Sequence, residues 1–177
     1  SNIILKILKK IIKLKNINKE IIIVDDGSTD NTKQIIKKKC KGLYTKFITY
    51  KKNRGKGFAC RKGLKNVTGK IVIIQDADLE YDPRDYKKLL KPILLNKTKI
   101  VYGSRVLEGG TRIRPNTTDV IVRLAANHFL TFFSNLLNNH NLTDAHTCYK
   151  VFKTELLNKI KLEEDGFNFC PEITARF

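Results

Sequence analysis

The sequence lacks a long hydrophobic run. Its longest apolar stretches, such as residues 21–24 and 71–74, are far shorter than the roughly 20 residues that a helix needs to cross a bilayer. Residues 1–15 mix Ile and Leu with Lys and contain neither an uninterrupted apolar segment nor a small-residue cleavage site. The sequence therefore predicts neither a transmembrane helix nor a cleaved signal peptide in these residues.

Cysteine is scarce and scattered. The four cysteines lie far apart and show no C-x-x-C spacing; they are Cys40, Cys60, Cys148 and Cys170. This pattern argues against a disulfide framework and against a zinc knuckle. A reducing compartment fits best, so we expect a cytoplasmic protein.

Acidic residues are few. Against 17 Asp and Glu stand 35 Lys and Arg, which gives a formal net charge of +18. Such a charge suits nucleic acid, but Lys far outnumbers Arg and the basic residues are spread along the chain, as on solvated helix faces. We therefore do not expect a nucleic-acid partner, whereas anionic lipids or phosphorylated ligands fit this surface.

The 177 residues, 41% of them hydrophobic, are enough for one packed domain rather than a disordered tail.

The order of helices and strands indicates an α/β protein. Runs rich in β-branched residues predict strands over 20–24, 47–50, 70–75 and 99–103, and helical spacing predicts helices over 1–15, 32–39, 56–65, 84–95 and 120–138. Strands that alternate with helices favour a mostly parallel sheet flanked by helices. A turn leads into a further strand over 144–152, and 155–177 reads as helix and loop. The basic helix over 1–15 suits packing on a sheet, and also a membrane surface.

Acidic residues gather where two predicted strands end. Asp25 and Asp26 follow the first strand, and Asp76 and Asp78 follow the third. The carboxyl ends of parallel strands form the ligand-binding edge of an open sheet, and neighbouring carboxylates repel one another unless a cation lies between them. Asp76, Asp78 and Glu80 therefore predict a site for Mg²⁺ or Mn²⁺. Each Asp taken alone is equally explained as a turn or helix-capping residue.

Four segments, in this order, resemble family 2 glycosyltransferases with the GT-A fold. The segments are IIVDDGSTD at 22–30, NRGKG at 53–57, DAD at 76–78 and GSR at 103–105. The closest resemblance is to the branch of dolichyl- and polyprenyl-phosphate sugar synthases, which 142–150 and 166–172 also resemble. The ordered set is far more specific than any one segment.

The resemblance implies transfer of a sugar from a nucleotide-diphosphate sugar to an acceptor. The acceptor it favours is a polyprenyl or dolichyl phosphate, in a metal-dependent reaction that inverts the anomeric carbon. This would place the protein at the cytoplasmic face of a membrane, as a peripheral partner of the lipid surface. Two alternatives stay open: transfer to a glycan hydroxyl, and a degenerate domain that binds a nucleotide sugar without catalysis.

The resemblance also implies roles for individual residues. Residues 25–28 (Asp25, Asp26, Gly27, Ser28) would line the nucleoside pocket, and Asn53, Lys56 and Gly57 would flank it. Asp76 and Ala77 would lie near the ribose or the metal, Asp78 and Glu80 would hold the cation, Arg105 would face the phosphates and Arg123 would hold an acceptor phosphate. Lys56 and Arg123 are equally well explained as solvated surface cations.

Two departures from the family pattern affect these expectations. Asp144 and His146 are candidates for a general base, but the sequence reads Asp-Ala-His where relatives often carry a second acid. A phosphate acceptor would need no base. The family's first strand should precede the helix that begins near Ser1, and relatives continue beyond Phe177. We therefore expect one GT-A domain over 1–177, truncated at both ends, which binds its donor weakly and associates through an exposed sheet.

Overall fold

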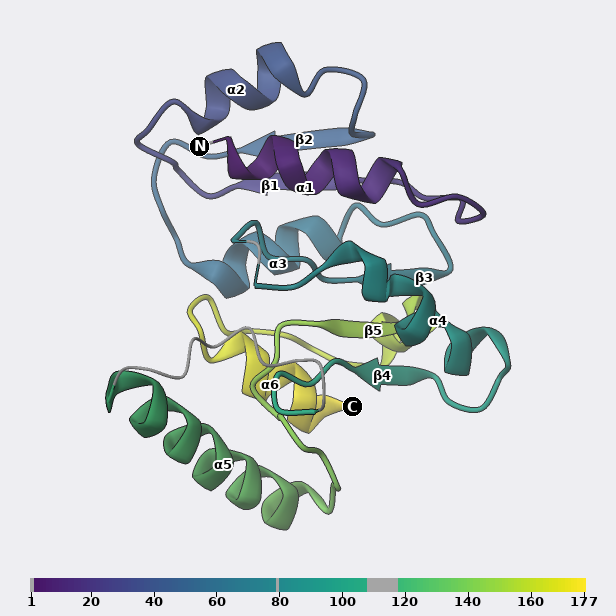
Figure 1. The fold of residues 1–177 in the computed structure, drawn as a ribbon, viewed down its shortest axis with the longest axis vertical. Helices are drawn as coiled ribbons and strands as arrows, with labels where there is room; N and C mark the ends of the chain where they lie inside the picture. Colours follow the sequence, from purple (N-terminus) through teal and green to yellow (C-terminus); the bar gives the residue numbers. More distant parts are fainter. Residues whose placement is uncertain (1, 79, 108–117) are drawn as a thin grey trace.

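The computed structural model describes residues 2–78, 80–107 and 118–177, which form helices packed around short strands (Figure 1). The elements follow the predicted order closely. The α-helices are α1 (Ile3–Ile12), α2 (Thr32–Lys39), α3 (Lys56–Leu64), α4 (Tyr86–Leu94), α5 (Thr118–Asn138) and α6 (Phe169–Arg176), and two 3-10 helices are η1 (Pro83–Asp85) and η2 (Thr154–Lys159). The strands are β1 (Ile22–Asp25), β2 (Lys46–Thr49), β3 (Ile71–Ile73), β4 (Ile100–Tyr102) and β5 (Lys150–Lys153).

The strands form two small sheets. β1 pairs in parallel with β2, with Ile23 opposite Phe47. β5 lies between β3 and β4 and pairs antiparallel with both, with Val151 opposite Ile73 and Val101. The predicted α/β class is confirmed. The expectation of a mostly parallel sheet needs one correction, because β5 runs against its two neighbours, and the described pairings are therefore one parallel and two antiparallel.

β1 and β3 run in the same direction without pairing with each other. At their amino ends, the Glu20 carboxylate accepts hydrogen bonds from the backbone N–H groups of Thr68 and Gly69, both at 2.6 Å. At their carboxyl ends, Asp25 and Asp76 line one common cavity. Between the two strands lies a second cavity of about 320 Å³, whose walls include β1, β3 and α3.

The hydrogen-bond pattern shows which backbone groups face this cavity. Lys46 N–H donates to Ile21 C=O, and Tyr50 N–H donates to Asp25 C=O, so alternate residues of β1 face β2. Residues 22 and 24 therefore direct their backbone groups toward the cavity. By the same alternation, the bond from Ile74 N–H to Lys150 C=O directs 71 and 73 of β3 toward it from the other side. In the row of strands β2, β1, β3, β5 and β4, the cavity lies between β1 and β3, where one further strand would fit.

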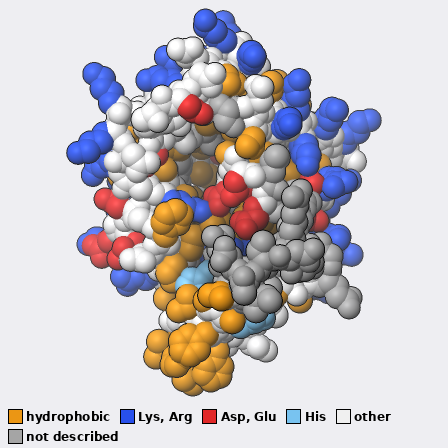
Figure 2. Space-filling view, turned by 60° about the vertical axis from the view of Figure 1, so that its left-hand side comes forward, with side chains coloured by type: hydrophobic (Ala, Val, Ile, Leu, Met, Phe, Trp, Pro, Cys, Tyr) orange, Lys and Arg blue, Asp and Glu red, His pale blue; other side chains and the backbone are white. Residues whose placement is uncertain are grey.

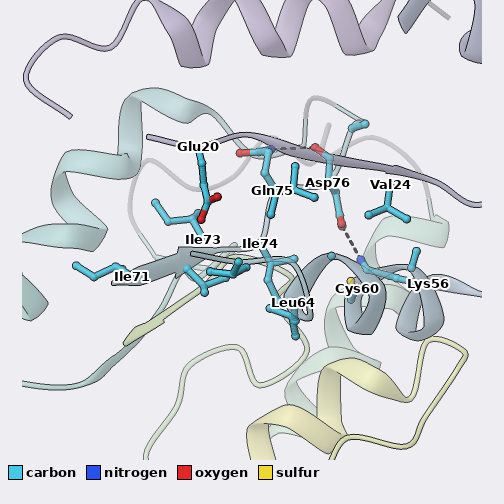
Figure 3. Close-up of a pocket in the computed structure, with 16 residues that line it drawn as sticks. Glu20, Val24, Lys56, Cys60, Leu64, Ile71, Ile73, Ile74, Gln75 and Asp76 are labelled. Carbon is cyan, nitrogen blue, oxygen red and sulfur yellow. Dashed lines mark hydrogen bonds and ion pairs between the residues drawn. The ribbon is translucent and has the colours of Figure 1, made fainter. Parts of the chain in front are cut away.

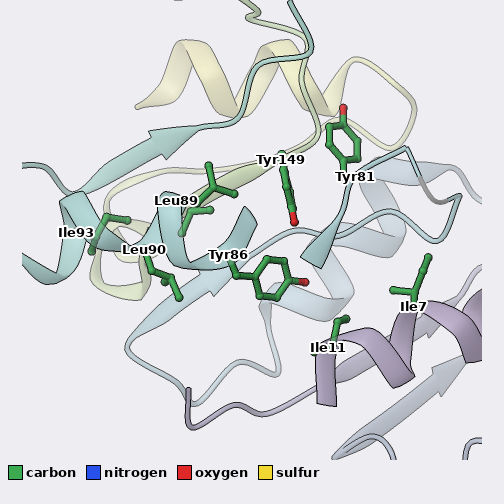
Figure 4. Packing of buried hydrophobic residues seen from close by; sticks show 9 residues of the cluster. Ile7, Ile11, Tyr81, Tyr86, Leu89, Leu90, Ile93 and Tyr149 are labelled. Atoms are coloured by element: carbon green, nitrogen blue, oxygen red, sulfur yellow. The ribbon is translucent and has the colours of Figure 1, made fainter. Parts of the chain in front are cut away.

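A cluster of apolar and aromatic side chains packs α1 and α4 against β5 (Figure 4). Ile7 and Ile11 of α1 recur at the four-residue spacing that places them on one helix face, and both are buried. Tyr81, Tyr86 and Tyr149 fill the centre, with ring centroids 4.8 Å and 6.0 Å from Tyr149. Burial of each large side chain stabilises the fold by about 1.5–3 kcal/mol, which fixes the loops at the carboxyl ends of β1 and β3.

Among the described residues, no helix is both long and apolar enough to span a membrane.

Candidate functional site

Asp25 is a buried turn residue. Its Oδ1 accepts a hydrogen bond from Ser28 N–H at 3.2 Å, and its Oδ2 accepts one from Thr49 Oγ1 at 3.0 Å. The residue as a whole is 5% exposed. Both oxygens therefore serve to close the loop after β1 and to hold it against β2.

Asp26 keeps one oxygen available. Its Oδ2 accepts hydrogen bonds from the backbone N–H groups of Arg54 and Gly55, at 3.0 Å and 2.7 Å. Its Oδ1 is buried and has no hydrogen-bond partner among the described residues. Because a buried carboxylate oxygen without a donor is costly, this atom is the acceptor that the pocket offers to a ligand.

Two glycines allow close approaches that a side chain would block. Gly27 has a φ of +76°, and a Cβ there would lie 2.6 Å from the backbone N of Asn53, so only glycine fits where the two loops meet. A Cβ on Gly57 would collide with the carbonyl oxygen of Glu164, and Gly57 N–H donates to Gly166 C=O at 3.1 Å. Gly57 thus anchors the start of α3 to the segment before α6 and does not present its N–H to the pocket.

Lys56, the first residue of α3, contacts Asp76, which lies beyond the end of β3 (Figure 3). Its Nζ lies 2.6 Å from Asp76 Oδ2 and 2.5 Å from Cys148 Sγ. Burial lowers the pKa of Lys56, but the Asp76 carboxylate raises it by more, so the net shift is upward. Lys56 is therefore a fixed cation, and the surface-cation interpretation of this residue is wrong because its side chain is only 17% exposed.

Three carboxylates lie along the edge after β3. Asp78 Oδ1 accepts a hydrogen bond from Glu80 N–H at 2.9 Å, and both residues are exposed. Burial raises the pKa of Glu80, and the neighbouring Asp78 and Asp76 carboxylates raise it further. In the part of the chain that the structure describes, no three His, Cys, Asp or Glu side chains converge closely enough to form a complete metal site.

These carboxylates still suit a divalent cation that also binds a diphosphate. Their oxygens are the hard donors that Mg²⁺ and Mn²⁺ prefer, and such a cation commonly takes only one or two carboxylates from the protein. Since Asp76 is paired with Lys56, Asp78 and Glu80 fit this role better than Asp76. Burial is the main cause of the raised pKa of Glu80, Arg105 opposes it, and the smaller contribution from Asp78 and Asp76 is the repulsion that a bound cation would relieve.

Arg105 is held rigidly by Asp144. The guanidinium donates to both carboxylate oxygens, from Nε to Oδ2 at 2.8 Å and from Nη2 to Oδ1 at 3.0 Å, and Arg105 N–H also donates to Oδ2. Asn127 of α5 donates to Asp144 Oδ1 at 3.3 Å. Arg105 Nη1 lies 4.0 Å from Glu80 Oε1, so the guanidinium faces the acidic edge.

This arrangement corrects the expectation that Asp144 acts as a general base. Burial by itself raises the pKa of Asp144, but the hydrogen bonds and charge of Arg105 lower it by more. The side chain is fully buried, and both of its oxygens are occupied. Asp144 is therefore a permanently ionised residue that positions Arg105, and it is not placed to accept a proton from an acceptor.

The remaining predicted residues are placed as follows. His146 is half-buried, and burial lowers its pKa, although the neighbouring Asp144 carboxylate opposes this shift. Ser28, Asn53 and Ala77 are exposed at the rims of the two loops. Arg123 belongs to α5, but its side chain lies outside the described residues.

The structure brings most of these residues to one edge. Asp25, Asp26 and Ser28 share a cavity of about 260 Å³ with Asp76 and Ala77. Figure 2 looks toward this edge and shows acidic side chains beside a hollow, with a basic side chain nearby.

Three further residues contribute to the site and were not predicted from the sequence. They are Gln75, whose Nε2 donates to Asp76 C=O, Cys148, which contacts Lys56, and Asn127, which donates to Asp144. Gln75 could have been found from the sequence, because it directly precedes Asp76. No feature of the sequence around Asn127 indicates a role in the site.

Comparison with known proteins identifies the family. The profile of the family described as "Glycosyl transferase family 2" matches residues 1–161. The chain belongs to glycosyl transferase family 2. The predicted family is confirmed by this match.

Curated members of the family extend beyond the chain. An uncharacterized protein of Methanocaldococcus jannaschii is 32% identical over 173 residues, which cover 90% of this chain and 66% of that protein. A dolichyl-phosphate beta-glucosyltransferase of Saccharomyces cerevisiae is 30% identical over 87% of this chain and 51% of that protein. This chain thus spans between about half and two thirds of these relatives. The similarity to a dolichyl-phosphate enzyme agrees with the predicted branch.

Solved structures confirm the fold. A glucosyl-3-phosphoglycerate synthase from Mycobacterium tuberculosis, in complex with phosphoglyceric acid, superposes with a TM-score of 0.62 at 21% identity, over 97% of this chain and 58% of that one. The same synthase in complex with Mn²⁺, uridine diphosphate and glucosyl-3-phosphoglycerate gives a TM-score of 0.59 at 19% identity, over 96% and 59%. The GT-A type of α/β fold in this family 2 chain is therefore confirmed.

Proposed function

We propose that this chain transfers a sugar from a nucleotide-diphosphate sugar to a lipid phosphate such as dolichyl or polyprenyl phosphate. One observation carries the proposal: the unpartnered Asp26 Oδ1, the Lys56–Asp76 pair and the acidic edge at Asp78 and Glu80 all lie at the carboxyl ends of the strands. The similarity to a dolichyl-phosphate beta-glucosyltransferase and to a dolichol-phosphate mannosyltransferase of Pyrococcus furiosus supports the lipid acceptor.

The first loop binds the nucleoside. Asp26 Oδ1, buried beside the backbone of Arg54 and Gly55, accepts a hydrogen bond from an N–H or O–H of the base or ribose. Asp25 acts indirectly, because its oxygens hold the loop in shape. Lys56 orients the Asp76 carboxylate in the pocket.

The acidic edge is suited to a divalent cation that binds together with the diphosphate. Asp78 and Glu80 would hold this cation through their carboxylate oxygens. When bound, a divalent cation neutralises the negative charge that develops on the departing nucleoside diphosphate. Arg105 faces the same edge, and its guanidinium adds a fixed positive charge there.

The acceptor phosphate attacks without a general base. One of its anionic oxygens forms a bond to the anomeric carbon while the bond from that carbon to the diphosphate oxygen breaks, and the leaving group departs with the electron pair. A single displacement of this kind inverts the anomeric configuration. The engagement of Asp144 with Arg105 is compatible with this route, because a phosphate acceptor does not need the proton acceptor that a hydroxyl would require, and of the two candidate bases only His146 is left for that role.

An apolar face on α5 supports a lipid-bound acceptor. Its large hydrophobic side chains are exposed to solvent, and Figure 2 shows hydrophobic side chains gathered at the lower end of the molecule, where α5 lies in Figure 1. Exposed patches of this kind mark protein or membrane contacts. Asn127 of the same helix contacts Arg105 at 3.4 Å. A membrane beneath α5 would therefore lie beside Arg105 and the acidic edge that it faces. We therefore propose peripheral attachment to a membrane surface.

A transfer assay tests the proposal. The protein is incubated with radiolabelled sugar conjugates of UDP or GDP, Mn²⁺ and vesicles that contain polyprenyl phosphate, and the label is then partitioned between organic solvent and water. We expect label in the organic phase, reduced at least about 100-fold in Asp78→Ala and unchanged in Glu155→Gln, a carboxylate of the exposed Lys99 pair. Label that reaches only a water-soluble glycan would contradict the lipid acceptor, and nucleotide binding without any transfer would contradict catalysis.

A further inference from the structure

Two thiols meet beneath the proposed donor site. Cys148 lies two residues before β5, and Cys170 lies in the first turn of α6. Their Sγ atoms are 3.6 Å apart, although both cysteines are free. The two cysteines are 22 residues apart in the sequence and belong to different elements, so the fold brings them together.

The surroundings of the pair favour a thiolate. The Lys56 Nζ lies 2.5 Å from Cys148 Sγ, and the buried Lys150 ammonium and the first turn of α6 add positive potential near Cys170. The hydrogen bond from the Cys148 thiol lowers the pKa of Cys170. By contrast, burial raises the pKa of the neighbouring Cys60 thiol to about 12, which leaves that thiol protonated and unreactive.

We propose that Cys148 and Cys170 form a redox-modification site in which a small hydroperoxide converts the two thiols into a disulfide. The Cys170 thiolate attacks the peroxide oxygen, the O–O bond breaks, and a sulfenic acid and water form once protons are taken up. The Cys148 sulfur then attacks the sulfenic sulfur and displaces its oxygen as a second water. In sum, two thiols lose two electrons and two protons, and one hydrogen peroxide becomes two waters.

The modification alters the proposed donor site. Formation of the S–S bond shortens the 3.6 Å separation of the two sulfurs to about 2.05 Å, so it draws Cys148 Sγ toward Cys170 and ties the segment before β5 to α6. Because Lys56 Nζ donates to Cys148 Sγ as well as to Asp76, this displacement alters one of the two contacts that fix Lys56. On the basis of the proposed function, we expect nucleotide affinity to change on oxidation and to recover with dithiothreitol.

Peptide mapping tests the modification without reference to nucleotide binding. The reduced protein is treated with a slight excess of hydrogen peroxide, blocked with N-ethylmaleimide, digested with trypsin and examined by mass spectrometry. We expect the peptide that ends at Lys150 to be joined to the peptide that ends at Arg176. The number of thiols titrated in denaturant should fall from four to two, and dithiothreitol should restore it.

Serine variants make the outcome specific. Cys170→Ser should abolish the cross-link, whereas Cys60→Ser and Cys40→Ser should form it at the wild-type rate. If all four thiols survive, or if the cross-link joins any other pair, the proposed site is wrong. Because a variant could fail to fold, circular dichroism is recorded for each, and the wild-type peptide map alone still decides the question. A cross-link that leaves nucleotide affinity unchanged would overturn only the link to the donor site.

Discussion

At the scale of single residues, the partners of a carboxylate decide what it can do. Asp25 and Asp26 are neighbours, yet Asp25 has both oxygens occupied, whereas Asp26 keeps a buried oxygen with no donor in the part of the chain that the structure describes. Asp144 is fully buried and gives both oxygens to Arg105. A ligand can therefore be bound by Asp26, while Asp25 and Asp144 maintain the shape of the site.

The Arg105–Asp144 pair predicts a stability loss. Asp144→Asn leaves a partly buried guanidinium without its charged partner, so we expect the free energy of unfolding in urea to fall by roughly 2–3 kcal/mol at pH 7. The matched control is Glu155→Gln, which breaks an exposed pair with Lys99 and should cost less than about 1 kcal/mol. Equal losses in the two variants would show that Asp144 is an ordinary surface acid.

Lys150 predicts a dependence of stability on pH. Burial lowers the pKa of this lysine to about 8 in the folded chain, below the value of about 10.4 in an unfolded chain. Between these values the unfolded chain holds a proton that the folded chain has released, so stability rises with pH. The free energy of unfolding of wild type, relative to Lys150→Met, should rise by roughly 2 kcal/mol from pH 7 to pH 10. A difference that stays constant with pH would refute this.

The sequence could predict candidate site residues but not their partners. Asp76, Asp78 and Arg105 were recognisable because they lie within a few residues of the ends of β3 and β4. The contacts of Lys56 with Cys148 and of Arg105 with Asp144 join residues 92 and 39 positions apart, and nothing local encodes such distances. For that reason the assignment of Asp144 as a base was wrong, and the position of Asn127 was not foreseen.

At the scale of elements, local chemistry placed the helices well. The spacing of Ile7 and Ile11 predicts the buried face of α1. The helix predicted over 84–95 is present as α4, and the short η1 precedes it, where Asp82 Oδ1 accepts a hydrogen bond from Arg84 N–H at 3.0 Å. The direction of β5 could not be predicted, because strand pairing depends on the tertiary arrangement and not on the local pattern. α5 exposes large hydrophobic side chains, and packing within the described part of the protein does not explain this exposure.

α5 predicts binding to lipid vesicles. Phe132 and Leu136 lie four residues apart on one helix face and are 62% and 67% exposed. Replacing both with Ser should weaken cosedimentation with vesicles by about tenfold or more, since each buried side chain of this size contributes about 1.5–3 kcal/mol. Leu94→Ser on α4, 66% exposed, should bind like wild type. Equal binding of all three proteins would remove α5 as the membrane contact.

At the scale of the whole molecule, the cavity between β1 and β3 separates the two small sheets. Backbone groups of both strands face it, at residues 22, 24, 71 and 73, and its walls are largely apolar. Strands that expose such groups pair readily with other chains. The expected self-association and weak donor binding remain predictions, as does the description of 1–177 as one domain.

The cavity predicts concentration-dependent association. In sedimentation velocity experiments we expect dimers or larger species as the protein concentration rises. A soluble peptide with about five consecutive Val and Ile residues, long enough for one strand, should bind and reduce this association. The control peptide carries Pro at alternate positions, which removes the N–H groups that a strand donates. A protein that stays monomeric and ignores both peptides would show that this cavity does not accept a strand.

The central claim is that the edge formed by Asp26, Asp78 and Glu80 binds a nucleotide-diphosphate sugar through a divalent cation. Calorimetric titration with UDP, GDP and their common sugar conjugates, first with Mn²⁺ and then with chelator, tests it most directly. We expect one nucleotide series to bind, chelator to abolish binding, and Asp26→Ala and Asp78→Ala each to weaken it by about tenfold or more. If no nucleotide binds at millimolar concentration, or if neither substitution affects binding, this edge is not a metal-dependent nucleotide-sugar site.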